Sequence, residues 1–157
     1  MKARSLTPLI LFLTLAACSS SDGAPSTSNT SGWAGSADVF LARWNNAVTA
    51  AYKIDAFHAD SDGSSVGKFL AGKVTLYKGA YSFGTQDKSV FLALCAQTAE
   101  AALGIPSDDA KALVEQAYSN ERADGVTGFG MVEYQNYQVS LAGLNNMWPA
   151  CTVGPKG

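Results

Sequence analysis

The first 17 residues contain the most apolar stretch of the 157-residue chain. Whether this stretch is cleaved decides which residues are left to form the core. The run "LTPLILFLTL", residues 6–15, carries no charge and follows Lys2 and Arg4. It is about ten residues long, whereas a helix that spans a bilayer needs about 20. A positive start, a short apolar run and small residues after it are typical of a secretory signal. We therefore expect residues 1–17 to be cleaved and to contribute nothing to the core.

The end of this segment, Leu15-Ala16-Ala17-Cys18, resembles the lipobox of bacterial lipoproteins. The resemblance implies cleavage just before Cys18, diacylation of its thiol and acylation of the new amino group. Two or more acyl chains hold a protein on a membrane, whereas one chain is marginal. In the best-known sorting rule an aspartate after the cysteine retains a lipoprotein at the inner membrane, so Ser19 favours the outer membrane. The resemblance thus implies a lipid-anchored protein of the bacterial cell envelope that faces the periplasm.

Residues 18–35 are expected to form a lipidated, Ser/Thr-rich tether that is flexible over residues 19–32. The segment "SSSDGAPSTSNTSG" has too little apolar surface to offset the entropy of ordering it. It also argues against the alternative that Cys18 is an ordinary signal-peptide or core residue. Without the signal, nine basic and 13 acidic side chains remain, which is a net charge of −4. An acidic body argues against a nucleic-acid partner, which requires a basic patch.

The rest of the chain, residues 36–157, is expected to form a single domain with three helices. Ser36 is a candidate N-cap for a helix that ends near Tyr52. Gly104 and Pro106 end a second helix over residues 88–103, and Ser107 caps a third. Apolar positions spaced by three and four residues give each helix one apolar face. These positions are Phe40, Trp44, Ala47, Val48 and Ala51 in the first, Phe91, Leu94, Cys95, Thr98, Ala99 and Ala102 in the second, and Ala110, Leu113, Val114, Ala117 and Tyr118 in the third.

Two further segments predict antiparallel strands. Residues 54–84 alternate and predict two or three strands, with a tight turn at Lys78-Gly79. The run "FGMVEYQNYQVSL" predicts a hairpin around Gln135-Asn136, in which Asn136 tolerates positive φ. Residues 145–153 predict a final strand or an extended tail. The predicted fold is α+β: an N-terminal helix, an antiparallel β-meander, two helices and a C-terminal β-hairpin, with the helices packed on one face of an antiparallel sheet.

The three cysteines are Cys18, Cys95 and Cys151. If Cys18 carries lipid, as the resemblance implies, Cys95 and Cys151 remain in an oxidising compartment, where a disulfide is the default. Two free thiols and a redox pair are the alternatives. The redox pair is disfavoured because the two residues are far apart in the sequence and do not form a CxxC motif. A disulfide would fix the C-terminal segment to the middle helix.

Three motifs resemble sites that bind nucleotides or metal ions. The run "GKFLAGKV", residues 67–74, nearly matches a P-loop, but Val74 replaces the hydroxyl that would hold Mg²⁺ and the run leads into a strand. His58, the only histidine, lies near Asp60 and Asp62, whose spacing fails as a calcium loop. The glycines of residues 125–130 also precede a strand and do not form a dinucleotide fingerprint. We therefore expect no metal, nucleotide or other cofactor.

The aromatic residues Tyr134, Tyr137 and Trp148 are candidates for a binding surface. With the anchor and tether, they favour a non-catalytic binding module, of inhibitor or immunity type, with an envelope protein as partner. The alternative is an envelope hydrolase that uses His58 with a serine, or the carboxylates of Asp60 and Glu133, or a small-ligand carrier with an internal cavity. The run "FLARWNNA", residues 40–47, resembles the first helix of several uncharacterised bacterial lipoproteins and implies no function.

Overall fold

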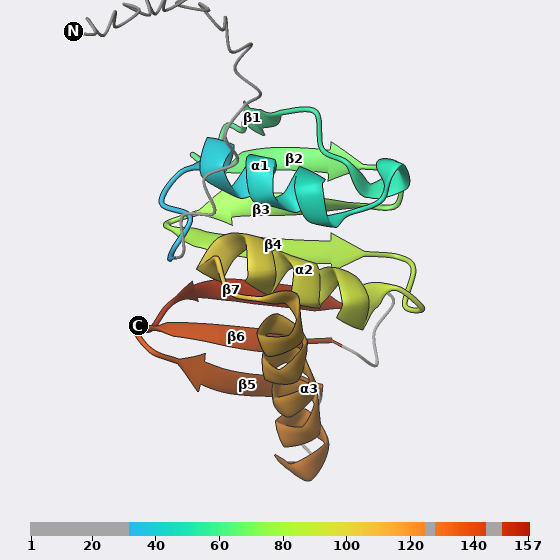
Figure 1. Cartoon of the computed structure of the whole chain (residues 1–157), viewed down its shortest axis with the longest axis vertical. Helices are drawn as coiled ribbons and strands as arrows, with labels where there is room; N and C mark the ends of the chain where they lie inside the picture. The colour runs from blue at the N-terminus through green and yellow to red at the C-terminus, as the bar shows by residue number, and fades with distance from the viewer. Residues whose placement is uncertain (1–31, 125–127, 144–148) are drawn as a thin grey trace, which may run out of the picture.

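The computed structural model describes residues 32–124, 128–143 and 149–157. The predicted signal, Cys18 and residues 19–31 of the predicted tether lie outside these residues, so the lipobox prediction is not tested. The described chain forms three α-helices and one seven-stranded antiparallel sheet (Figure 1). The predicted α+β class is therefore confirmed. None of the described helices is long and apolar enough to cross a membrane.

The sheet has the strand order β1-β2-β3-β4-β7-β6-β5, and every neighbouring pair is antiparallel. The segment predicted to hold two or three strands holds four, because the P-loop-like run itself forms a hairpin. The last strand lies between the meander and the C-terminal hairpin, and thereby joins them into one sheet. The strands are β1 (Phe57–Ala59), β2 (Ser65–Phe69), β3 (Gly72–Tyr77), β4 (Ala80–Thr85), β5 (Phe129–Tyr134), β6 (Tyr137–Ala142) and β7 (Ala150–Pro155).

The three helices are α1 (Ala37–Ala47), α2 (Phe91–Leu103) and α3 (Ser107–Asp124), and a short 3₁₀ turn, η1, covers Ala50–Tyr52. Figure 1 shows all three helices in front of the sheet. The Ser36 hydroxyl accepts a hydrogen bond from the Val39 backbone N–H and thus caps α1. Gly104 ends α2 in the left-handed region, with φ of 63°. Ser107 is the first residue of α3 rather than the residue before it.

The core lies between these helices and the inner face of the sheet. Phe40 of α1 stacks on Tyr81 of β4, with ring centroids 4.2 Å apart, and Trp44 lies next to Phe40. The predicted faces of α2 and α3 supply the other half, including the fully buried Ala99 and Ala110. The spacing of apolar residues therefore identified the buried side of α2 and α3. For the first helix it identified Phe40 and Trp44, but α1 ends at Ala47 rather than near Tyr52, and Ala51 is exposed in η1.

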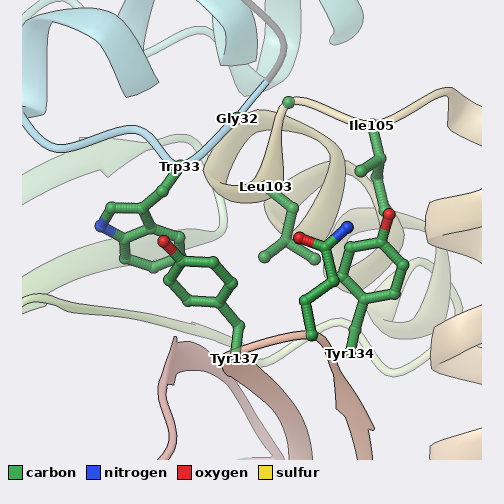
Figure 2. A pocket seen from close by; sticks show the side chains of 8 residues that line it. Gly32, Trp33, Leu103, Ile105, Tyr134 and Tyr137 are labelled. Atoms are coloured by element: carbon green, nitrogen blue, oxygen red, sulfur yellow. The ribbon is translucent and has the colours of Figure 1, made fainter.

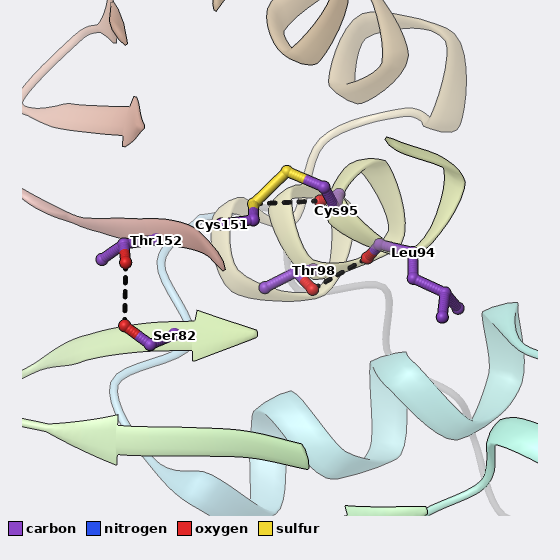
Figure 3. Close-up of a disulfide and its surroundings, with 6 residues drawn as sticks. All are labelled: Ser82, Leu94, Cys95, Thr98, Cys151 and Thr152. Atoms are coloured by element: carbon purple, nitrogen blue, oxygen red, sulfur yellow. Dashed lines mark hydrogen bonds between the residues drawn. A yellow bond between two sulfur atoms is a disulfide. The ribbon is translucent and has the colours of Figure 1, made fainter. Parts of the chain in front are cut away.

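The predicted disulfide is present between Cys95 on α2 and Cys151 on β7 (Figure 3). Both cysteines are fully buried, and their Cα atoms are 5.7 Å apart. Thr152, the next residue of β7, points away from the core and shares a hydrogen bond of 2.8 Å with Ser82. The strand β7 is thus fixed by its two neighbouring strands and by a covalent link to the helix layer.

The two predicted turns differ in which residue takes positive φ. Lys78 and Gly79, with φ of 48° and 77°, form the two-residue connection between β3 and β4. In the C-terminal hairpin, however, Gln135 takes the positive φ of 52°, and Asn136 does not. The hairpin register is unaffected, since Tyr134 pairs with Tyr137 directly across the turn.

Candidate functional site

The two carboxylates that the hydrolase alternative uses together, those of Asp60 and Glu133, are far apart in this fold. Asp60 directly follows β1, which carries the exposed His58 at one edge of the sheet, and Glu133 lies on β5 at the other edge. Six strand spacings of about 4.8 Å separate these strands, or about 29 Å. Glu133 forms an ion pair with Lys156 instead. The pairing of Asp60 with Glu133 is therefore disfavoured.

The acidic residues near His58 have a local structural role. Hydrogen bonding with the Ser64 side chain, and then with the Ser64 backbone N–H at 2.8 Å, lowers the pKa of Asp62 from its ordinary value. The Asp60 carboxylate accepts from the Ser61 backbone N–H in the same turn. Among the described residues, no three His, Cys, Asp or Glu side chains gather as metal ligands would.

The glycine-rich motifs are also parts of strands. Gly67 and Lys68 lie on β2, and Gly72 and Lys73 lie on β3, where the two lysines face each other and are exposed. A P-loop would require a helix N-terminus at this point. Of the other glycine run, Gly130 is a buried residue of β5, while residues 125–127 lie outside the described part of the chain.

The candidate site is a surface pocket with a volume of about 260 Å³ near the C-terminal hairpin (Figure 2). Figure 2 shows Tyr134 and Tyr137 flanking the pocket, with Leu103 between them and Trp33 against Tyr137. The residues that line it are Gly32, Trp33, Leu103, Gly104, Ile105, Tyr134, Gln135 and Tyr137. Two of the three predicted binding residues thus share one site. The third, Trp148, lies outside the described residues.

The pocket lies where the turn of the C-terminal hairpin meets the connection between α2 and α3. Tyr134 and Tyr137 are a cross-strand pair, so both side chains project from the same face of the sheet. They follow Val132 and precede Val139 in the two-residue alternation, and those two valines are buried. Leu103, the last residue of α2, and Ile105 just after it line the pocket together with the two rings, which remain only partly buried.

The N-terminal segment closes one side of the pocket. The Trp33 ring stacks on Tyr137 with centroids 4.6 Å apart and planes 13° from parallel. The Ala34 backbone N–H donates to the Ala102 carbonyl at 2.7 Å, and Ala34 is buried. The predicted tether boundary at residue 35 is therefore wrong for residues 32–35, which belong to the folded domain. A single tryptophan within a Ser/Gly-rich stretch was the only sequence signal for this.

Tyr81 of β4 binds this N-terminal segment through its hydroxyl. Its hydroxyl donates to the Ala34 carbonyl at 2.7 Å and lies 3.0 Å from the Ser36 carbonyl. Burial raises the pKa of Tyr81 to about 12. The neutral phenol therefore stabilises the fold fully below pH 10, the ordinary pKa, and this contribution is lost as the pH rises to about 12.

Replacing Tyr81 by Phe is expected to lower the free energy of unfolding by about 1–2 kcal/mol at pH 7, because the carbonyl of the buried Ala34 loses its donor. Between pH 10 and 12, wild type should lose stability faster than Tyr81→Phe, by up to about 1.4 kcal/mol per pH unit. Urea unfolding at several pH values measures both effects. Tyr77→Phe is the control, because Tyr77 is 43% exposed. Parallel pH profiles for wild type and Tyr81→Phe would contradict the assignment.

None of the described residues that line the pocket has a charged side chain. Arg43 of α1 contacts the backbone beside it: its Nη1 donates to the carbonyls of Gly32, at 2.7 Å, and Ala101, at 3.1 Å. The C-terminus of α2 carries partial negative charge, and the guanidinium compensates it. Desolvation lowers the pKa of Arg43 from its ordinary value, although the group stays charged. The pocket is therefore electrically neutral.

No protein-family model, curated protein or solved structure matches this chain.

Proposed function

We propose that this protein is a non-catalytic binding module of the bacterial envelope, held on the outer membrane by lipid on Cys18. The observation that supports the binding role best is the aromatic pocket, in which the partly exposed rings of Trp33, Tyr134 and Tyr137 meet at the surface. Rings of this kind are common at binding hot spots. The pocket opens at the surface, which suits contact with an envelope partner better than the enclosed cavity of a carrier.

In this proposal the domain from residue 36 acts as one scaffold. The N-terminal helix, the meander, the two helices and the C-terminal hairpin place the helices on one face of the sheet, and the pocket lies where the helix layer ends. An inhibitor or immunity-type protein would use such a rigid site to engage an envelope protein. Residues 19–31 would let the domain move away from the membrane surface to reach it.

The anchor is tested by fractionation of cells that express the full chain. Cys18→Ser is expected to release the protein from the membrane fraction, because the acylated thiol is lost. Ser19→Asp is the matched control: it should keep the protein in the membrane fraction but shift it from the outer to the inner membrane. If Cys18→Ser fractionates like wild type, the lipid anchor is wrong.

The binding role is tested by cross-linking the full-length protein in intact envelopes. Wild type and the control Tyr77→Ala are expected to give the same cross-linked species, since Tyr77 lies on β3 and outside the pocket. Tyr137→Ala should lose those species while keeping its thermal unfolding temperature within a few degrees. Cross-linking that is unchanged by Tyr137→Ala would remove the pocket from the proposed function.

A further inference from the structure

The pocket combines aromatic faces with polar groups that form no hydrogen bond with the part of the chain that the structure describes. Among the described residues, no hydrogen bond uses the hydroxyls of Tyr134 and Tyr137, the Gln135 side-chain amide or the Trp33 indole N–H. The bottom is apolar, with Leu103 and Ile105. A ligand that fits this lining offers an apolar face to the rings and hydrogen-bonding groups around its edge.

The neutrality of the pocket excludes the common charged ligands. A carboxylate or phosphate would lose its hydration without gaining a counter-charge, because Arg43 already donates to two backbone carbonyls. A quaternary ammonium would suit the rings, but none of the described lining residues has a carboxylate to balance its charge. The ligand is therefore neutral.

The volume limits the size of the ligand. About 260 Å³ lies just below the roughly 300–1,000 Å³ of sites that hold drug-sized molecules. The pocket therefore holds about one ring. A purely apolar occupant of this size would leave the two phenol hydroxyls and the Gln135 amide with fewer partners than they have in water.

We propose that the pocket binds one neutral pyranose ring of an envelope glycan. The C–H face of the sugar lies against Tyr137, whose ring is held in place by Trp33. The sugar hydroxyls exchange hydrogen bonds with the two phenols and the Gln135 amide. An N-acetyl group on the ring would place its methyl against Leu103 and Ile105. This inference rests on the proposed function, because it assumes that the pocket is the contact site.

The test uses the full-length lipidated protein in a detergent without a sugar headgroup, titrated by calorimetry. The probes are a β-1,4-linked trimer of N-acetylglucosamine and a trimer of glucose. A single bound ring should give a dissociation constant of about 1 mM. Tighter binding of the first probe would indicate an N-acetylated wall glycan, and tighter or equal binding of the second another envelope glycan; either result supports the proposal.

The variants separate stacking from hydrogen bonding. Tyr137→Ala is expected to weaken binding at least tenfold, and Tyr137→Phe about two- to threefold, because the latter keeps the ring. Tyr77→Ala should bind as wild type does. If Tyr137→Ala fails to fold, Tyr137→Phe and Tyr134→Ala still test the site, since each leaves the Trp33–Tyr137 ring stack in place.

Binding of neither trimer by wild type would overturn the sugar assignment, as would binding that no pocket variant alters. If Tyr137→Ala still abolishes envelope cross-linking while neither trimer binds, the proposed function stands and the occupant is an apolar side chain of a protein. If cross-linking is also unaffected, both the proposed function and the sugar assignment fail.

Discussion

Breaking the Cys95–Cys151 bridge is expected to lower the free energy of unfolding by about 4 kcal/mol. The bridge joins residues 56 apart in the sequence, and in the entropy model a closed loop of this length restricts the unfolded chain by about that amount. Both cysteines are fully buried, so Cys95→Ala with Cys151→Ala also removes packing against the core. Urea unfolding of the double variant, followed by circular dichroism, gives the difference.

Reducing agent provides the control for this prediction. Wild type in excess reductant should unfold at a urea concentration between those of oxidised wild type and the double variant, because it loses the bridge but keeps both side chains, and the variant itself should not respond to reductant. Because β7 still pairs with β4 and β6, the variant should keep the sheet at low urea. A loss below about 1 kcal/mol would show that strand pairing alone fixes the C-terminal segment.

Replacing Gly104 by Ala is expected to lower the free energy of unfolding by about 3 kcal/mol. Two effects contribute. The left-handed φ of 63° costs an L-residue about 1 kcal/mol. A Cβ would also lie 2.6 Å from the Gly32 carbonyl oxygen and 2.8 Å from Arg43 Nη1, and crowding of this kind costs about 1–3 kcal/mol. The substitution pushes the N-terminal segment away from the end of α2, so Trp33 should also lose its contact with Tyr137.

The variant Gly79→Ala measures the cost of the left-handed backbone conformation without steric crowding. Gly79 has a φ of 77°, similar to that of Gly104, but no atom lies within 4 Å of where its Cβ would be. We expect a loss of about 1 kcal/mol for Gly79→Ala. Thermal or urea unfolding of the two variants side by side separates strain from crowding. Equal losses would show that residue 32 and Arg43 do not pack against Gly104 in solution.

Most of the secondary structure could be predicted from the sequence, because the spacing of apolar residues follows which side of a helix or strand is buried. Helices α2 and α3 bury the faces that their three- and four-residue spacing predicts, and Gly104 ends α2 as expected. The count of strands was wrong because β2 lies within a glycine- and lysine-containing run that lacks clear alternation. The sequence predicted positive φ at Asn136, because Asn tolerates that conformation better than Gln. In the structure Gln135 has the positive φ, because the hairpin register sets the backbone of the turn.

The candidate site was predicted only in part. Tyr134 and Tyr137 were identified because they flank a turn, where aromatic side chains are expected to be exposed. Their meeting with Trp33 could not be predicted, since Trp33 is about 100 residues away in the sequence and lies at the end of a stretch that composition assigns to a tether. The pocket depends on where α2 stops relative to the hairpin, which is a matter of packing and not of local pattern.

The sequence by itself determined the α+β class, the faces of the helices and the pairing of Cys95 with Cys151, because local periodicity and redox chemistry depend on few residues. Only the tertiary structure decided that β7 lies between β4 and β6, that His58 and Glu133 lie at opposite edges of the sheet, and that Trp33 closes an aromatic pocket. These features arise from contacts between distant segments, and the free energy of such contacts is set by the whole packed core rather than by any stretch of the chain.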